Sequence, residues 1–151
     1  AMHVLRAEKG FIIVGQETDG SVTPHDLGMD WIISKTKPDF IGKRALSRQS
    51  MAYDSRKQLI GLLSNDPSTV IPEGAHAVID PLQPPPMDML GQVTSSYFSP
   101  NCGRSIAMAM LKGGRGLMGQ TIYFPMLDGT VLDATVVNPI FYDPKGARID
   151  G

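Results

Sequence analysis

The apolar and polar positions along the chain divide it into two parts. Up to about residue 50, short apolar runs alternate with glycines and turn-forming residues, which predicts short helices and strands. From Arg56 onward, apolar runs recur between glycine and proline turns, a pattern typical of successive β-strands. The fold class that this pattern predicts is α+β, and mainly β.

We expect six strands in the second part of the chain. They cover residues 57–63, 75–79, 91–97, 106–111, 121–125 and 130–137. Asp128 and Gly129, between the last two strands, are the clearest hairpin signal in the sequence. Small residues alternate with large ones in the fourth strand, as at the inward-facing positions of a small barrel. Because closure removes exposed sheet edges, we predict a closed, antiparallel, six-stranded, Greek-key-like β-barrel.

The first part of the chain carries several helix and turn signals. Gly10 has the position of a helix C-cap, and Thr23-Pro24 has the pattern of a helix start. The predicted elements are a helix end over 5–9, a strand over 11–14, a short helix over 23–28 and a further helix over 39–46. We place a domain boundary between them and the barrel, so that 1–52 form one unit and 53–151 the other.

Composition and charge narrow the range of functions. The chain has 151 residues, of which 42% are hydrophobic, enough to bury a core. A net charge of −1 gives no basic footprint for nucleic acid or an anionic membrane. Cys102 is the single cysteine, which excludes an intrachain disulfide and fits a reducing compartment. No apolar run is long enough to cross a bilayer, so we expect a cytoplasmic protein with neither nucleic-acid nor membrane partners.

The motifs offer little conventional catalytic chemistry. The glycine-rich run 113–116 lacks the lysine of a P-loop and does not open a helix after a strand, so a plain turn is the better interpretation. The histidines are scattered and the cysteine is single, so no zinc spacing exists. Cys102 would need a histidine partner to act as a nucleophile, which favours an ordinary thiol. We expect no catalytic residue and no metal site in this chain.

Three residues are candidates for ligand binding. Arg6 and Glu8 are two positions apart, so on a helix they point to different sides. One interpretation is a pair of solvated charges, and the other is that one of them points into a ligand cleft. The guanidinium of Arg6 offers a planar fork of donors that suits heteroaromatic acceptors or a carboxylate. Tyr142, in the tail after the last strand, is the aromatic residue that packing explains least.

Several spaced motifs resemble one known family over nearly all of the chain. They are LRAEKG at 5–10, TP at 23–24, LG at 27–28, FIGK at 40–43, GQVTS at 91–95, IAMA at 106–109 and the glycine at 119. In this order they resemble the aminomethyltransferase (glycine cleavage T-protein) family. Within it, LRAEKGFIIVGQETDG, TPHDLGM, KPDFIGKRAL and FYDPKGARIDG are similar to the α subunits of heterotetrameric sarcosine oxidases. Val14 stands where T-proteins usually carry a tyrosine, which favours the oxidase group.

The resemblance implies a tetrahydrofolate site in a central hole between three lobes. It assigns Arg6 to the pterin and Tyr142, more loosely, to the neighbourhood of the folate. The family's catalytic acid and its pterin-binding glutamate belong to an earlier part of the protein, as do the FAD, FMN and NAD sites of the oxidases. In those enzymes oxidised sarcosine yields its one-carbon unit to the folate as 5,10-methylenetetrahydrofolate. Folate and the other oxidase subunits are therefore the expected partners.

Alternatives remain open at this point. Ala1 before Met2 is typical of a cloning remnant, and we expect the chain to be an excised C-terminal part of a longer protein, inactive alone. Residues 1–52 would then be the end of the folate-binding lobe. An apolar face left uncovered would promote self-association. The chain could instead belong to a glycine-cleavage-type aminomethyltransferase, or be a non-catalytic barrel for subunit contact.

Overall fold

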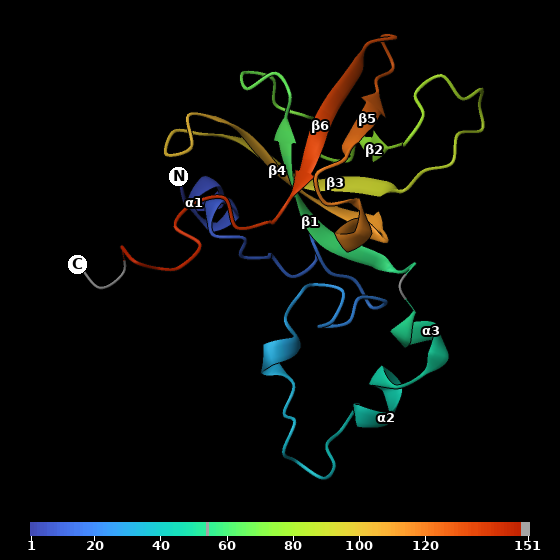
Figure 1. Cartoon of the computed structure of the whole chain (residues 1–151), viewed down its shortest axis with the longest axis vertical. Coiled ribbons are helices and arrows are strands. Elements are labelled where there is room, and N and C mark those ends of the chain that lie inside the picture. The colour runs from blue at the N-terminus through green and yellow to red at the C-terminus, as the bar shows by residue number, and fades with distance from the viewer. Residues whose placement is uncertain (54, 149–151) are drawn as a thin grey trace.

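The computed structural model describes residues 1–53 and 55–148, and it contains one curved sheet with short helices around it (Figure 1). The helical elements are α1 (Met2–Glu8), η1 (Asp30–Ile32), α2 (Lys43–Leu46), α3 (Gln49–Ala52) and η2 (Gly114–Leu117). The strands are β1 (Lys57–Ser64), β2 (His76–Ala77), β3 (Gly91–Ser99), β4 (Arg104–Lys112), β5 (Thr121–Pro125) and β6 (Val131–Val137). Each of the six strands predicted in the second part of the chain is present, although β2 is shorter than expected.

The strands form one antiparallel sheet in the order β2-β3-β4-β1-β6-β5. β1 pairs with β4 on one side and with β6 on the other. A first strand that lies beside the fourth of a consecutive series gives a Greek-key arrangement. The predicted fold class, mainly β with a six-stranded Greek-key-like sheet, is therefore confirmed.

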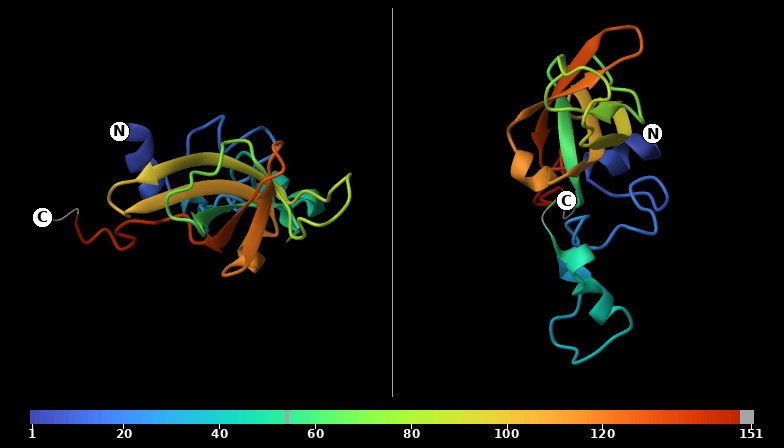
Figure 2. Two further views of the ribbon diagram at one scale, coloured as in Figure 1. Left: turned by 90° about the horizontal axis from the view of Figure 1, so that it is seen from above. Right: turned by 90° about the vertical axis from the view of Figure 1, so that its right-hand side faces the viewer.

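The predicted closure of the barrel is wrong, because the two edge strands share no ladder. β2 and β5 approach each other only at one bridge beyond the end of β2. There the N–H of Val78 donates to the carbonyl of Tyr123 at 2.9 Å, and the N–H of Tyr123 donates back at 3.0 Å. The chain then enters a proline-rich loop, which supplies few N–H donors, so the pairing cannot be extended. The result is a strongly curved sheet rather than a closed one (Figure 2).

β4 is buried on both faces and separates two apolar clusters. Ala107, Ala109 and Leu111 face the cluster enclosed by the curved sheet. Ile106, Met108 and Met110 face a second cluster, on the side where Ala7 of α1 packs. Successive side chains of a strand point to opposite faces, which accounts for the division. The small residues predicted to face the barrel interior do so.

The strand predicted over 11–14 is absent. The carboxylate of Glu17 accepts the N–H of Ile13 at 2.7 Å, and the N–H of Glu17 donates to the carbonyl of Ile13 at 3.1 Å. The segment therefore closes into a turn, and these backbone groups are not available to a neighbouring strand. Phe11 and Val14 remain largely exposed.

The short helix predicted over 23–28 is only a hydrogen-bonded turn. Contacts typical of a helix start do form, since the carboxylate of Asp26 accepts the N–H of Thr23 at 2.8 Å and its hydroxyl at 2.9 Å. The carbonyl of Asp26, however, accepts the N–H of Leu59 in β1 at 2.8 Å. This bond uses the acceptor that a following helical turn would need, and Gly28 then ends the segment with a φ of 71°.

Residues 30–52, called the arm from here on, leave the sheet and return to it as β1 begins (Figures 1 and 2). The arm contains η1, α2 and α3, and neither η1 nor α2 has a buried residue. Ile41 is fully exposed, and 78% of the surface of Trp31 is accessible. The helix predicted over 39–46 begins only at Lys43, because Gly42 has a φ of 94°, outside the helical range.

Two further expectations concern single features. The glycine-rich run 113–116 is not a plain turn, because most of it forms η2. A Cβ on Gly114 would lie 2.9 Å from Cγ2 of Ile60, so glycine here allows η2 to pack closely on β1. No helix in the described part of the chain is long and apolar enough to span a membrane.

Candidate functional site

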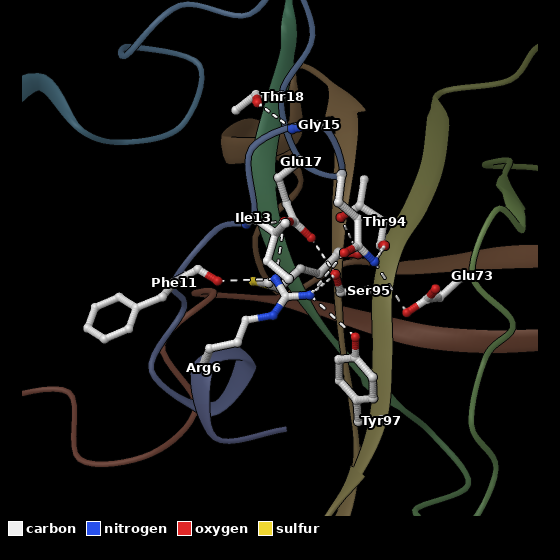
Figure 3. A network of polar contacts seen from close by, with 12 residues as sticks. Arg6, Phe11, Ile13, Gly15, Glu17, Thr18, Glu73, Thr94, Ser95 and Tyr97 are labelled. Atoms are coloured by element: carbon white, nitrogen blue, oxygen red, sulfur yellow. Dashed lines mark hydrogen bonds and ion pairs between the residues drawn. The ribbon is translucent and has the colours of Figure 1, made fainter. Parts of the chain in front are cut away.

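Helix α1 carries both Arg6 and Glu8, the two charged residues that the sequence singles out. The guanidinium of Arg6 points toward β3, where Nη2 donates to Oγ of Ser95 at 2.6 Å and to the hydroxyl of Tyr97 at 3.3 Å (Figure 3). Nη1 donates to the carbonyl of Phe11 at 3.1 Å and lies 3.1 Å from Oε2 of Glu17. The Arg6 side chain is 10% exposed, so it is not the solvated charge of the simpler interpretation.

Glu17 completes this network around the guanidinium (Figure 3). Its side chain has no accessible surface, and it accepts hydrogen bonds from Arg6, from the backbone of Ile13 and from the hydroxyl of Ser95. A buried carboxylate is costly unless it is paired and hydrogen-bonded, and here both conditions are met. The sequence analysis did not identify Glu17, because only the tertiary fold brings it to Arg6.

Arg6 nevertheless keeps one unused donor. Its Nε atom is buried and has no hydrogen-bond partner within the described residues. A buried donor without an acceptor costs roughly 1–3 kcal/mol, so a ligand acceptor or a water that reached it would be stabilising. An acceptor such as a ring nitrogen or carbonyl of a heteroaromatic ligand fits this atom chemically.

Glu8 points to a different place and has a different environment. Its carboxylate accepts the hydroxyl of Ser99 at 2.5 Å and the side-chain amide of Asn101 at 2.8 Å. Only 2% of its surface is accessible, and both donors are neutral. The expectation that Arg6 and Glu8 point to different sides is confirmed, and the interpretation of Glu8 as a solvated charge is wrong.

The end of α1 also holds the C-terminal tail. The backbone N–H groups of Phe141 and Tyr142 both donate to the carbonyl of Glu8 at 2.9 Å. Lys9 Nζ donates to the carbonyl of Asp143 at 2.7 Å and lies 3.4 Å from its carboxylate. Although burial raises the pKa of Asp143, the backbone N–H groups of residues 147 and 148 and the ammonium of Lys9 lower it more, so the pKa lies below its ordinary value.

Tyr142 belongs to this anchored tail. It lines a cavity of about 420 Å³ with Asn101, Cys102 and Arg104 among others, and Arg6 does not line this cavity. The guanidinium carbon of Arg148 is 5.4 Å from the centre of the Tyr142 ring. The structure therefore brings Tyr142 to the same helix as Arg6 but not into one cavity with it.

A larger and more apolar cavity lies beside α1. Its volume is about 640 Å³, and no acidic residue lines it among the described residues. The lining residues come from four separate segments of the chain, 9–12, 27–29 with Trp31, Arg115 with Met118, and 138–140, together with Leu59. Phe11 and Trp31 supply aromatic surface, and Lys9 and Arg115 supply cations. The sequence analysis missed this cavity, since its walls are distant from one another along the chain.

A second buried ion pair fixes the N-terminal segment to the start of the sheet. Arg56 Nη2 lies 2.6 Å from Oδ2 of Asp26, and Nε lies 3.0 Å from Oδ1. Burial raises the pKa of Asp26, but the hydrogen bonds from Arg56 and Thr23 lower it more, so the pKa lies below its ordinary value.

Among the described residues, no three His, Cys, Asp or Glu side chains gather as a metal site would require.

The comparisons with known proteins agree with one another. The family described as "Glycine cleavage T-protein C-terminal barrel domain" matches residues 57–143. "Sarcosine oxidase subunit alpha" of Corynebacterium sp. (strain P-1) is 47% identical over 154 residues, which cover 99% of this chain and 16% of that protein. "Aminomethyltransferase" of Cupriavidus taiwanensis is 36% identical over 138 residues, covering 91% of this chain and 33% of that protein.

A solved structure shares the fold. The glycine cleavage system aminomethyltransferase T from Bartonella henselae superposes with a TM-score of 0.78 at 23% sequence identity. The superposition covers 94% of this chain and 38% of that chain. The chain therefore spans well under half of the length of each of these proteins.

Proposed function

Because the chain belongs to the family of the glycine cleavage T-protein C-terminal barrel domain, we propose that it forms part of a tetrahydrofolate site in an enzyme of one-carbon transfer. The enzyme that we propose is a sarcosine oxidase, with this chain in its α subunit. The higher identity to "Sarcosine oxidase subunit alpha" than to "Aminomethyltransferase" supports this choice. The proposed partners are folate and the other subunits of such an oxidase.

One observation carries the folate proposal. Arg6 lies on α1, and the carbonyl of Glu8 on the same helix holds the backbone of Tyr142. Two residues assigned to folate from resemblance alone, at opposite ends of the chain, are thus fixed by a single helix. The buried Nε of Arg6 without an acceptor is a second point in favour, since a pterin offers acceptors of the right kind.

The proposed role of this chain is to bind and to shield rather than to react. Tetrahydrofolate, when bound, would supply the amine that takes up the one-carbon unit. The curved sheet and α1 would form one wall around it and exclude water, which protects a reactive imine from hydrolysis. The catalytic acid that the family requires is proposed to lie outside these residues.

Calorimetric titration with 5-formyltetrahydrofolate, a stable reduced folate, tests the proposal. We expect binding by the chain, weakened about tenfold or more by Arg6→Lys, because lysine keeps the charge beside Glu17 but loses the fork of donors. Tyr142→Phe is expected to weaken it less, and Tyr53→Phe, in an exposed residue away from α1, serves as the matched control. Unchanged affinity in both Arg6→Lys and Tyr142→Phe, with thermal unfolding also unchanged, would contradict the proposal.

A glycine-cleavage-type aminomethyltransferase is the second candidate, favoured by 36% identity over nine tenths of the chain. Both candidates use folate, so the titration does not separate them. The amine that supplies the one-carbon unit does: methylene transfer from oxidised sarcosine supports the oxidase, and transfer from an aminomethylated carrier protein supports the second candidate.

A further inference from the structure

We propose that the apolar cavity beside α1 is a binding site for an anion with a planar aromatic body, in which Arg115 receives the negative charge and Trp31 contacts the ring. This inference rests on the proposed function in one respect, the identity of the ligand. Under that function the ligand is the aminobenzoylglutamate half of the folate. The same chemistry is shared by simple aromatic carboxylates.

The first argument is electrostatic. Arg115 has no carboxylate partner within the described residues: its side chain donates only to the backbone carbonyl of His25. Lys9, the other cation at the cavity, is already paired with Asp143. Since no acidic residue lines the cavity, Arg115 makes it electropositive. A cation at the edge of an apolar cavity favours an anionic ligand over a neutral or cationic one.

The second argument concerns the aromatic surface. Trp31 and Phe11 line the cavity, yet 78% and 63% of their surfaces are accessible. Large aromatic side chains normally contribute stability by being buried, and here they are not. Exposed aromatic rings around a concave apolar surface are what a planar ligand requires for stacking. Arg115 is also suited to this role, because a guanidinium both stacks on rings and binds carboxylates in a bidentate manner.

The third argument is the space left by a glycine. A Cβ built on Gly28 would lie 3.7 Å from Nη2 of Arg115, an ordinary van der Waals distance, so the guanidinium lies next to this residue. Gly28 also has a φ of 71°, which favours glycine at this position. The hydrogen bond to the carbonyl of His25 holds Arg115 at the cavity that Trp31 and Phe11 also line. The site is thus assembled by the fold, and its cation is held by backbone contacts rather than by an opposing charge.

The volume agrees with this class of ligand. A cavity of about 640 Å³ lies within the range of roughly 300–1,000 Å³ that small-molecule sites occupy. Leu59 and Leu27 form part of its apolar lining, which would contact the ring.

Trp31 makes the test direct, since it is the single tryptophan of the chain. The probes are 5-formyltetrahydrofolate, p-aminobenzoylglutamate, benzoate and 6-hydroxymethylpterin, which lacks both the aminobenzoyl ring and the glutamate. Each is titrated while Trp31 fluorescence is recorded, with N-acetyltryptophanamide as the correction for absorbance, and the affinity is checked by calorimetry. We expect the folate and p-aminobenzoylglutamate to change the fluorescence and the pterin without glutamate to do so weakly or not at all.

Variants of Arg115 test whether its charge binds the anion. Arg115→Gln is expected to weaken p-aminobenzoylglutamate binding about three- to tenfold, as expected for an exposed charge-assisted contact, and Arg115→Lys to restore part of it. Arg44→Gln removes an exposed cation of the arm and is the matched control, expected to leave the affinity unchanged. Because Arg115 is exposed, these variants should fold as the parent chain does.

The outcomes separate the two claims. Binding of benzoate and p-aminobenzoylglutamate with the same dependence on Arg115, but no binding of the folate, supports the site and contradicts the proposed function. Folate binding that is indifferent to Arg115→Gln and does not affect Trp31 overturns the site and leaves the proposed function standing. No binding of any aromatic carboxylate overturns the site.

Discussion

The sheet and the arm differ in how much apolar surface they bury. In the sheet, β4 is buried on both faces and its residues belong to two apolar clusters. In the arm, short helical elements follow one another and neither η1 nor α2 buries a residue. Helices of three or four residues are not stable by themselves in water. The difference shows that the sheet holds its own structure, whereas the arm takes its path from its two attachments to the sheet.

The largest effect is expected from a matched pair of isoleucines. Ile60 in β1 has no accessible surface, and Ile41 in the arm is fully exposed. Ile60→Ala should lower the free energy of unfolding by about 4 kcal/mol, through lost burial and a cavity. Ile41→Ala should change it by less than about 0.5 kcal/mol. Urea unfolding of both variants measures the difference, and similar values for the two would refute the contrast between sheet and arm.

The attachment of the N-terminal segment to the sheet comes next. Asp26→Asn should lower the free energy of unfolding by about 3 kcal/mol near neutral pH, because it leaves the guanidinium of Arg56 without its buried carboxylate. Asp39→Asn, in an exposed aspartate of the arm, is the control and should have little effect.

The same pair predicts a pH dependence. The folded-state pKa of Asp26 is lowered, so its stabilisation is present above the unfolded pKa and is lost as pH falls below about 4. Denaturant titrations at several pH values should therefore show the gap between the parent chain and Asp26→Asn narrowing in acid. A gap that stays constant down to pH 2 would mean that the ion pair is not its source.

Two glycines give a smaller contrast. A Cβ on Gly61 in β1 would lie 2.6 Å from the carbonyl oxygen of Asn138 and 2.9 Å from the ring of Phe141. Gly61→Ala should therefore cost about 2 kcal/mol and displace the tail that Glu8 anchors. Gly42 in the arm has open space around it but a φ of 94°, so Gly42→Ala should cost only about 1 kcal/mol of backbone strain. Thermal unfolding ranks the two, and an equal or reversed order would contradict this assignment.

The smallest expected effect is the free energy of local opening of the arm. Because it buries so little, we expect trypsin to cleave first after the arm's basic residues at 35, 43, 44 and 48, under conditions in which the sheet stays intact. Mass spectrometry of early cleavage products would show this. First cleavage after Lys57 or Lys112, within the strands, would indicate that the sheet is the less stable region.

The success of the sequence analysis follows the same division. The strands were predictable because their alternation and their turns are local signals, such as Asp128-Gly129 between β5 and β6. The elements before residue 50 were predicted poorly where another group took over a backbone bond. The carboxylate of Glu17, four residues further on, accepts the N–H of Ile13 and closes a turn there. The N–H of Leu59 donates to the carbonyl of Asp26, and this partner is too distant along the chain to be visible in a local window.

The candidate sites show the same limit. Arg6 could be singled out from its residue type and from resemblance, and the structure adds that Glu17, Ser95 and Tyr97 hold its guanidinium. The cavity that Arg115 and Trp31 line was not predictable, because its walls come from segments far apart in the sequence.

The sequence by itself determined the six strands from Lys57 onward, the strongest turns and the small inward residues of β4, because period and turn chemistry act between near neighbours. Only the tertiary structure decided that the sheet stays open between β2 and β5, that Glu8 and Glu17 are buried, and that Arg115 lies over Gly28 without a counter-charge. These features depend on contacts between segments distant along the chain, whose energies appear only once the fold has formed.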